Sequence, residues 1–211
     1  MKKYFLLSFI FFINFIINAQ GFKVKASGTQ TFYFEDESGR NQATFFSTTP
    51  LEDITGTANG ISGSVTFDVA NFANTLRGKV IVKVASINTG IELRNKHLRS
   101  KNWLDAEKYP DIIFDIKSVT DVKQLADNKL SFKVIGNFSM HGVTKEISAN
   151  VEATYLDENE DTRKRAPGDL LGIRGKFNIK LSDFKVENQI IGNKVAEEIE
   201  VSVNIVGSNK K

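Results

Sequence analysis

Alternating apolar and polar positions run through most of the chain and predict a series of β-strands. The stretches that carry this repeat are residues 43–47, 61–69, 77–86, 112–119, 130–138, 147–155, 173–179 and 195–206. Successive side chains of a strand point to opposite faces, so each stretch offers one apolar row to a core. The pattern predicts about eight strands. Residues 48–60 and 121–128 are interpreted as turns, and the charged run 156–170 as a long exposed loop.

One passage, residues 94–119, interrupts the alternation. On a helical wheel, one half-circle holds Ile91, Leu93, Arg94, His97, Leu98 and Lys101, and the other holds Glu92, Asn95, Lys96 and Arg99. We therefore expect a short helix near residues 90–104, with the first set facing inward. Ionised groups on an inward face are costly unless they are paired or hydrated. Arg94 and its neighbours then either contact a polar ligand group or form ion pairs with Asp105, Glu107 or Asp111.

A strand-rich chain of this kind forms either a two-sheet sandwich or a closed antiparallel barrel. Several inward positions are small, namely Gly136, Ala149, Ala153 and Gly175. In a sandwich small residues leave destabilising voids, whereas a barrel of about eight strands has room for one small ligand. A barrel also removes open sheet edges. The alternative is that phenylalanine neighbours fill the gaps, and the pattern alone leaves both readings open.

The first 19 residues resemble a secretory signal peptide. Two lysines precede an apolar block that is shorter than the roughly 20 residues needed to span a bilayer, and Ala19 offers a small residue for cleavage. The alternative is an uncleaved N-terminal anchor. The chain has no cysteine, which excludes disulfides and a lipid-modified N-terminal cysteine. We expect residues 20–211 to form one exported domain, periplasmic or secreted.

Charge and chemistry narrow the function classes. Removing residues 1–19 takes away two lysines, so the formal charge falls from +3 to 3 − 2 = +1, which gives no electrostatic case for nucleic acid. Motifs of hydrolases and phosphate-binding loops are absent. The two histidines, His97 and His141, could complete a metal site with Asp105 or Asp183, or each could satisfy a local hydrogen bond. A third interpretation places them at a polar mouth that meets a ligand head group.

Three blocks carry a family resemblance: RNKHL at residues 94–98, WLDAEKYPDIIF at 103–114 and FSMHGVTKEI at 138–147. In this order they resemble the YceI-like proteins, over roughly residues 45–206. The resemblance implies an all-β, closed antiparallel, lipocalin-like barrel that holds a long-chain isoprenoid or similar lipid. It suggests a carrier or reservoir without cofactor, metal ion or catalytic residue, and transient contact with a membrane. Nothing in the sequence fixes the oligomeric state.

We expect two groups of residues to contact the lipid. The polar head would meet Arg94, His97 and His141. The apolar chain would be lined by Phe67, Val82, Phe114, Ile116, Phe132, Val134, Phe138, Val151, Phe177 and Val201. Two alternatives remain: a lipid-modifying or metal-dependent hydrolase that uses His97 and His141, and a ligand-free envelope protein with a filled core. Arg163, Lys164 and Arg165 either touch anionic lipid or belong to a solvated loop.

Overall fold

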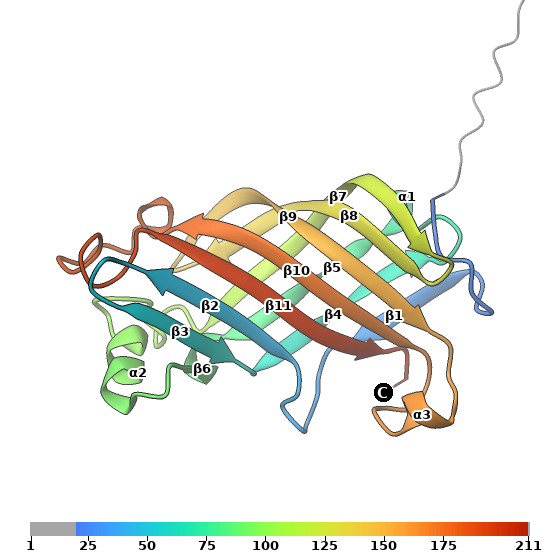
Figure 1. Ribbon diagram of the computed structural model, residues 1–211, viewed down its shortest axis with the longest axis horizontal. Coiled ribbons are helices and arrows are strands. Elements are labelled where there is room, and N and C mark those ends of the chain that lie inside the picture. The colour runs from blue at the N-terminus through green and yellow to red at the C-terminus, as the bar shows by residue number, and fades with distance from the viewer. Residues whose placement is uncertain (1–19, 211) are drawn as a thin grey trace, which may run out of the picture.

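The computed structural model describes residues 20–210, so the predicted signal peptide lies outside the described residues. This part of the chain contains eleven strands in one antiparallel sheet (Figure 1). The strands are β1 Thr29–Tyr33, β2 Gln42–Thr48, β3 Asp53–Ala58, β4 Ile61–Asp68, β5 Arg77–Lys83, β6 Ile87–Asn88, β7 Asp111–Ala126, β8 Lys129–Met140, β9 Val143–Leu156, β10 Leu170–Lys180 and β11 Glu198–Ser208. The helices are α1 Phe72–Thr75, α2 Glu92–Arg99 and α3 Glu160–Arg163, with 3-10 turns at Val84–Ser86 and Ser182–Phe184.

The sheet closes on itself. Eight strands follow one another in the order β1-β4-β5-β7-β8-β9-β10-β11, and Tyr33 of β1 pairs with Ser208 of β11 to complete the ring. The first half of β11 pairs instead with β2, which carries β3 and β6 outward at one end of the barrel. The predicted closed antiparallel barrel of about eight strands, with one short helix inserted near residues 90–104, is confirmed.

Strand β8 illustrates why these sequences form the barrel wall. Its residues alternate strictly between buried and half-buried, and Leu130, Phe132 and Val134 all point inward. Gly136 continues this row without leaving a hole. A Cβ atom there would lie 2.6 Å from the Phe114 ring. The phenylalanine therefore occupies the space, as the filled-gap alternative predicted for this position.

Three stretches interpreted as turns or loops hold regular structure. Residues 48–60 contain β3, and the β7–β8 hairpin turns at residues 127–128 because β7 continues to Ala126 through several bulges. Residues 156–170 contain α3, where the Asn159 side chain accepts hydrogen bonds from the backbone N–H groups of Asp161 and Thr162. This reciprocal cap stabilises a single helical turn that charge density alone does not reveal.

One end of the barrel is filled by aromatic rings. Phe32 stacks on Phe67 at a centroid distance of 5.6 Å, and Phe72 of α1 meets the edge of Phe67 at 5.0 Å. Phe22 and Tyr155 complete this aromatic plug, whose rings are almost fully buried. Each such pair contributes about 0.5–1.5 kcal/mol beyond area burial. We call this the closed end; the N-terminal segment and α1 lie here, and α2 lies at the opposite end (Figure 1).

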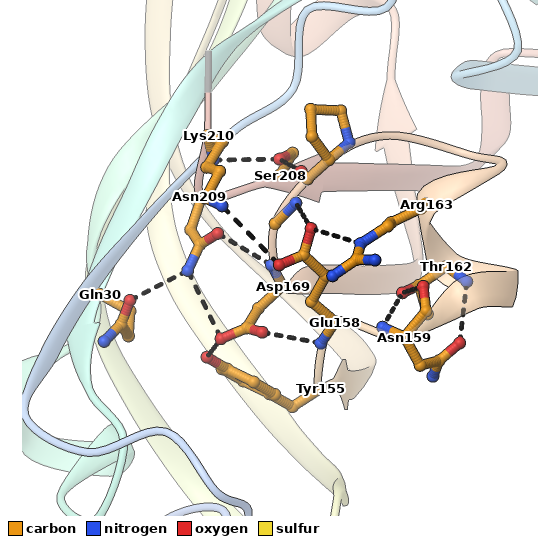
Figure 2. A network of polar contacts seen from close by, with 12 residues as sticks. Gln30, Tyr155, Glu158, Asn159, Thr162, Arg163, Asp169, Ser208, Asn209 and Lys210 are labelled. Carbon is orange, nitrogen blue, oxygen red and sulfur yellow. Dashed lines mark hydrogen bonds and ion pairs between the residues drawn. The ribbon is translucent and has the colours of Figure 1, made fainter.

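A polar network lies at the closed end, as Figure 2 shows. Asp169 accepts hydrogen bonds from the Tyr155 hydroxyl at 2.7 Å and from the Glu158 backbone N–H at 2.8 Å. Burial, followed by the hydrogen bond to Asp169, raises the pKa of the Tyr155 phenol far above its usual range. Asn209 joins the same carboxylate to Gln30 of β1. The network therefore links β9 and β1 to the residue before β10 and the residue after β11, where the ring closes.

The three basic residues of the 156–170 segment are paired. Arg163 meets Glu158 at 3.1 Å, Lys164 meets Asp161 at 2.6 Å and Arg165 meets Asp36 at 3.0 Å. Burial alone would raise the pKa of the Asp36 carboxyl, but its hydrogen bonds to Arg40 and Arg165 hold that pKa far below the usual range. Arg165 thus ties the segment to the β1–β2 connection. Among the described residues, no helix is both long enough and apolar enough to cross a bilayer.

Candidate functional site

A cavity of about 490 Å³ occupies the barrel interior between the aromatic plug and α2. This size lies within the range of small-molecule sites. Its wall is formed by inward rows from the barrel strands and is almost entirely apolar. The predicted lining residues that face it are Val82, Phe114, Ile116, Phe132, Val134, Phe138, Val151, Phe177 and Val201. The filled-core alternative does not match this interior.

The small residues divide between the cavity and the packed regions. Ala149 and Gly175 line the cavity, and a Cβ at Gly175 would make only ordinary contacts, with Val151 Cγ2 at 3.6 Å and the Asn150 carbonyl oxygen at 3.9 Å. Ala153 is fully buried outside the lining, and the space at Gly136 is filled. Phe67 also lies outside the lining because it belongs to the aromatic plug. Strand period identifies the inward face but does not give depth along the barrel axis.

The open end of the cavity, here called the mouth, is formed by α2 with the preceding Ile91, by Glu52 of the β2–β3 connection, and by Ile190, Lys194 and Val195. The charged residues that line the cavity are Glu52, Arg94 and Lys194, and His97 lies beside them. Arg94 Nη2 and Glu52 Oε2 are 3.1 Å apart, and both side chains are partly exposed. The mouth therefore combines an apolar opening with a small set of polar groups, an arrangement that suits an amphiphilic ligand.

The ion pair at the mouth differs from the pairs expected from sequence. Asp105, Glu107 and Asp111 were the candidate partners of the helix cations, but Arg94 pairs with Glu52 and Asp111 pairs with Lys83 at 2.7 Å. The reason is that residues 48–60 contain β3, so the β2–β3 connection reaches the helix. An assignment based on sequence proximity could not include Glu52.

Helix α2 is anchored by a residue that the wheel placed outward. Asn95 is only 4% exposed, and its Oδ1 accepts hydrogen bonds from the backbone N–H and the hydroxyl of Thr89 at 2.8 and 2.9 Å. Its amide group also donates to Asn88 at 3.0 Å. Meanwhile Ile91 and Leu93 line the cavity and remain 48% and 63% exposed. The apolar side of the helix thus borders the open mouth, and its polar side is tied to the barrel.

The two histidines line different hollows. His97 lines the main cavity, whereas His141 lines a second hollow with Lys101, Lys185 and Trp103. His141 Nδ1 lies 3.1 Å from the Phe184 carbonyl, and its ring meets Tyr109 edge-on at 5.1 Å. Within residues 20–210, no group of three or more His, Asp or Glu side chains is arranged to hold a metal ion.

Several lining residues were not among those predicted. Trp103 and Leu104 are buried at the mouth, and Ile190 and Val195 come from the irregular segment before β11. The inward row predicted for β10 began at Ile173. Leu171 lies two residues earlier and points to the same side, so extending the row by one position would have included it. No periodicity marks the loop residues, because their position depends on how the chain crosses the mouth.

Comparisons with known proteins agree with this architecture. A family profile described as the YceI-like domain matches residues 17–207. A UPF0312 protein of Pseudomonas fluorescens is 35% identical over 154 residues, covering 72% of this chain and 75% of its own. A UPF0312 protein of Yersinia enterocolitica is 31% identical over 156 residues, with 74% of each chain covered.

Solved structures share the fold at lower identity. BcnA of Burkholderia cenocepacia has a TM-score of 0.63 at 21% identity, covering 82% of this chain and 99% of its own. A polyisoprenoid binding domain from Saccharophagus degradans, implicated in plant cell wall breakdown, has a TM-score of 0.63 at 15% identity, covering 85% and 98%. With a profile matched over nearly its whole length and a cavity-bearing barrel of this kind, the chain belongs to the YceI-like family.

Proposed function

We propose that this protein carries a long-chain isoprenoid or a similar apolar lipid inside its barrel. The observation that supports this most is the apolar cavity of about 490 Å³, closed at one end by aromatic rings and open beside α2. The structural neighbour described as a polyisoprenoid binding domain points to the same ligand class. The apolar chain would enter first, toward the plug.

The polar head of the lipid would remain at the mouth. Arg94 and His97 border the cavity there, so they are the head-group contacts in this proposal. His141, which sequence reasoning grouped with them, faces the second hollow and bonds the Phe184 carbonyl, so it is not retained. Selectivity among lipids would come from these few polar contacts, because apolar walls discriminate weakly between chains.

Energetics favour reversible carriage over permanent storage. Burial of each methylene group is worth about 0.8 kcal/mol relative to water, but a membrane already supplies most of that free energy. Transfer from bilayer to cavity is then nearly balanced, and cargo exchanges in both directions. The proposal therefore includes transient membrane contact. It also includes export: residues 1–19 have the pattern of a cleaved signal peptide, which would place the protein in the periplasm or outside the cell.

Trp103 provides a direct test. It is the only tryptophan in the chain, it is buried, and it lines the cavity. A long-chain isoprenoid quinone delivered from detergent should quench its fluorescence in a saturable way, because the quinone ring would lie at the mouth. Native mass spectrometry of protein from its source should show a bound lipid. Linear quenching together with lipid-free spectra would contradict the proposal.

The hydrolase alternative has a separate test. It requires His97 and His141 to act on one substrate, yet they line different hollows. A His97→Ala, His141→Ala double variant should still bind the quinone with saturable quenching. Hydrolysis of a lipid ester that disappears in this variant would revive the alternative.

A further inference from the structure

Large apolar side chains are exposed around the mouth. Of the seven that are exposed in residues 20–210, four lie there: Leu51 at 65%, Ile91 at 48%, Leu93 at 63% and Ile190 at 38%. Leu51 adjoins Glu52, whose ion pair with Arg94 brings the β2–β3 connection against α2. Figure 1 places this connection, α2 and the segment before β11 at the same end of the barrel. An apolar rim of this kind marks an interaction surface.

The rim is continuous with the cavity wall. Ile91, Leu93 and Ile190 line the cavity and are exposed at the same time. A ligand leaving the barrel would therefore find a continuous apolar path from the wall to the rim, beside the Glu52–Arg94 ion pair. A rim whose only purpose was packing against the barrel would turn these side chains inward.

Unpaired cations flank the rim. Residues 91–101 contain four cations and one carboxylate. Of the cations at this end, Lys96 and Lys101 form no ion pair within residues 20–210, and neither does Lys194 at the opposite side of the mouth. Exposed apolar side chains bordered by lysine are typical of helices that lie in the interface of a membrane. Anionic head groups attract such cations at the membrane surface.

We propose that this end of the barrel docks onto the surface of a bilayer that carries anionic phospholipids, with the mouth against the membrane. The docking face consists of Leu51, Ile91, Leu93, Lys96, Lys101, Ile190 and Lys194. The inference rests on the proposed function, because the docked cavity would open directly to the membrane that supplies its cargo. A second copy of the chain fits this face less well, since a two-fold contact would bring the unpaired lysines together.

Sedimentation with vesicles tests the docking. The protein should bind vesicles made of equal parts phosphatidylcholine and phosphatidylglycerol and should bind phosphatidylcholine vesicles more weakly. A Leu51→Glu, Lys96→Glu double variant should reduce binding to the anionic vesicles about tenfold. The matched control is a Lys123→Glu, Leu125→Glu double variant, which makes the same change of three charges on exposed residues near the end of β7. This site lies at the closed end, where the carbonyl oxygen of residue 127 accepts a hydrogen bond from the Lys23 backbone N–H. This control should bind vesicles like the unaltered protein.

Two readouts separate failure of docking from failure of cargo binding. Leu51 and Lys96 lie outside the cavity lining, so quinone delivered from detergent should still quench Trp103 in the double variant. Quinone delivered from anionic vesicles should quench it about tenfold more slowly than in the control. Equal vesicle binding by both variants would overturn the docking proposal even if quinone binds. The proposal would also be overturned if the unaltered protein formed a dimer and did not bind vesicles, while the double variant was monomeric. The face would then belong to an interface with a second copy of the chain.

Discussion

The hydroxyl of Tyr155 donates a hydrogen bond of 2.7 Å to Asp169, which joins β9 to the residue just before β10 at the closed end of the barrel. The tyrosine ring belongs to the aromatic plug, and the carboxylate belongs to the polar network outside it. The pair therefore connects the two layers that close the barrel. Its position far from the mouth means that it governs stability more than ligand exchange.

A Tyr155→Phe variant should lose about 1–2 kcal/mol of unfolding free energy at neutral pH, because one buried hydrogen bond to a charged group disappears. The pKa of the Tyr155 phenol is raised in the folded state by burial and then by Asp169. Its stabilising effect is complete below the unfolded pKa of about 10 and is lost as pH rises beyond it. Denaturant titrations from pH 8 to 11 should show this alkaline loss in the unaltered protein and less of it in the variant. Tyr109→Phe at the opposite end should leave the alkaline loss in place.

The contribution of Asp36 to the free energy of unfolding should depend on pH in the opposite direction. Although burial opposes ionisation, Arg40 and Arg165 lower the pKa of this carboxyl in the folded state. Its contribution is therefore present above the unfolded pKa of about 4 and is lost as pH falls toward the folded value. Asp36→Asn should destabilise the protein by about 2 kcal/mol at pH 7 and by somewhat less at pH 3, where only part of the contribution is lost because the folded pKa lies far below the usual range. Asp53→Asn, at the start of β3, is the control, and equal losses at both pH values would contradict the prediction.

Two glycines of β10 allow a matched test of the cavity. Gly175 lines the cavity, and the nearest atom to an added Cβ would be Val151 Cγ2 at 3.6 Å. Gly172 is outside the lining, and an added Cβ there would meet only the Thr154 carbonyl oxygen, at 3.8 Å. We expect Gly175→Leu to fill the cavity and abolish saturable quinone quenching while the protein stays folded. Gly172→Leu should bind quinone normally, and equal binding by both variants would argue against an internal ligand.

These glycines also show how far sequence reasoning reached. The two-residue alternation of apolar and polar positions placed Phe132, Val134 and Gly175 on the inward face, because every second side chain of a strand points to the same side. It could not tell that Phe67 lies in the plug, since depth depends on the tilt of the strands. It also missed β3, whose Gly56 receives the Phe45 ring: a Cβ there would lie 2.2 Å from that ring. The buried row of β3 is Ile54, Gly56 and Ala58, so its alternation is carried mostly by small residues and is easily read as a turn.

The helix shows a second limit. The wheel grouped Ile91, Leu93 and Arg94 correctly as one side of α2, but it assumed that the apolar side must be the buried side. Burial instead falls on Asn95, because Thr89 and Asn88 satisfy its amide. The apolar face of α2 lies beside an open cavity, so it is an exception to the rule that the apolar face of a helix is buried. Local sequence does not reveal such an opening.

Arg94 should influence ligand choice more than stability. Its ion pair with Glu52 is partly exposed, and such pairs contribute about 0–1 kcal/mol. Arg94→Met should therefore change the unfolding free energy by less than about 1 kcal/mol. Affinity for an isoprenoid with an acidic head should fall several-fold relative to the corresponding alcohol, as measured by Trp103 fluorescence. Arg163→Met, which breaks a pair at the closed end, should change neither affinity. Equal losses for acid and alcohol would show that Arg94 does not contact the head.

Asn95 should control how firmly α2 is held at the mouth. Its side chain accepts two hydrogen bonds from Thr89 and donates one to Asn88, and it is almost completely buried. Asn95→Ala leaves the Thr89 backbone N–H without this partner, at a local loss of about 1–3 kcal/mol. Because the helix borders the cavity, amide hydrogen exchange in residues 92–99 and release of bound quinone should both accelerate. Lys96→Ala, on the exposed neighbouring residue, should leave both rates unchanged when the quinone is released into detergent, where no membrane docking is involved. If exchange accelerates in Asn95→Ala while quinone release does not, then loosening of α2 does not open the exit and cargo leaves past residues 190–195 instead.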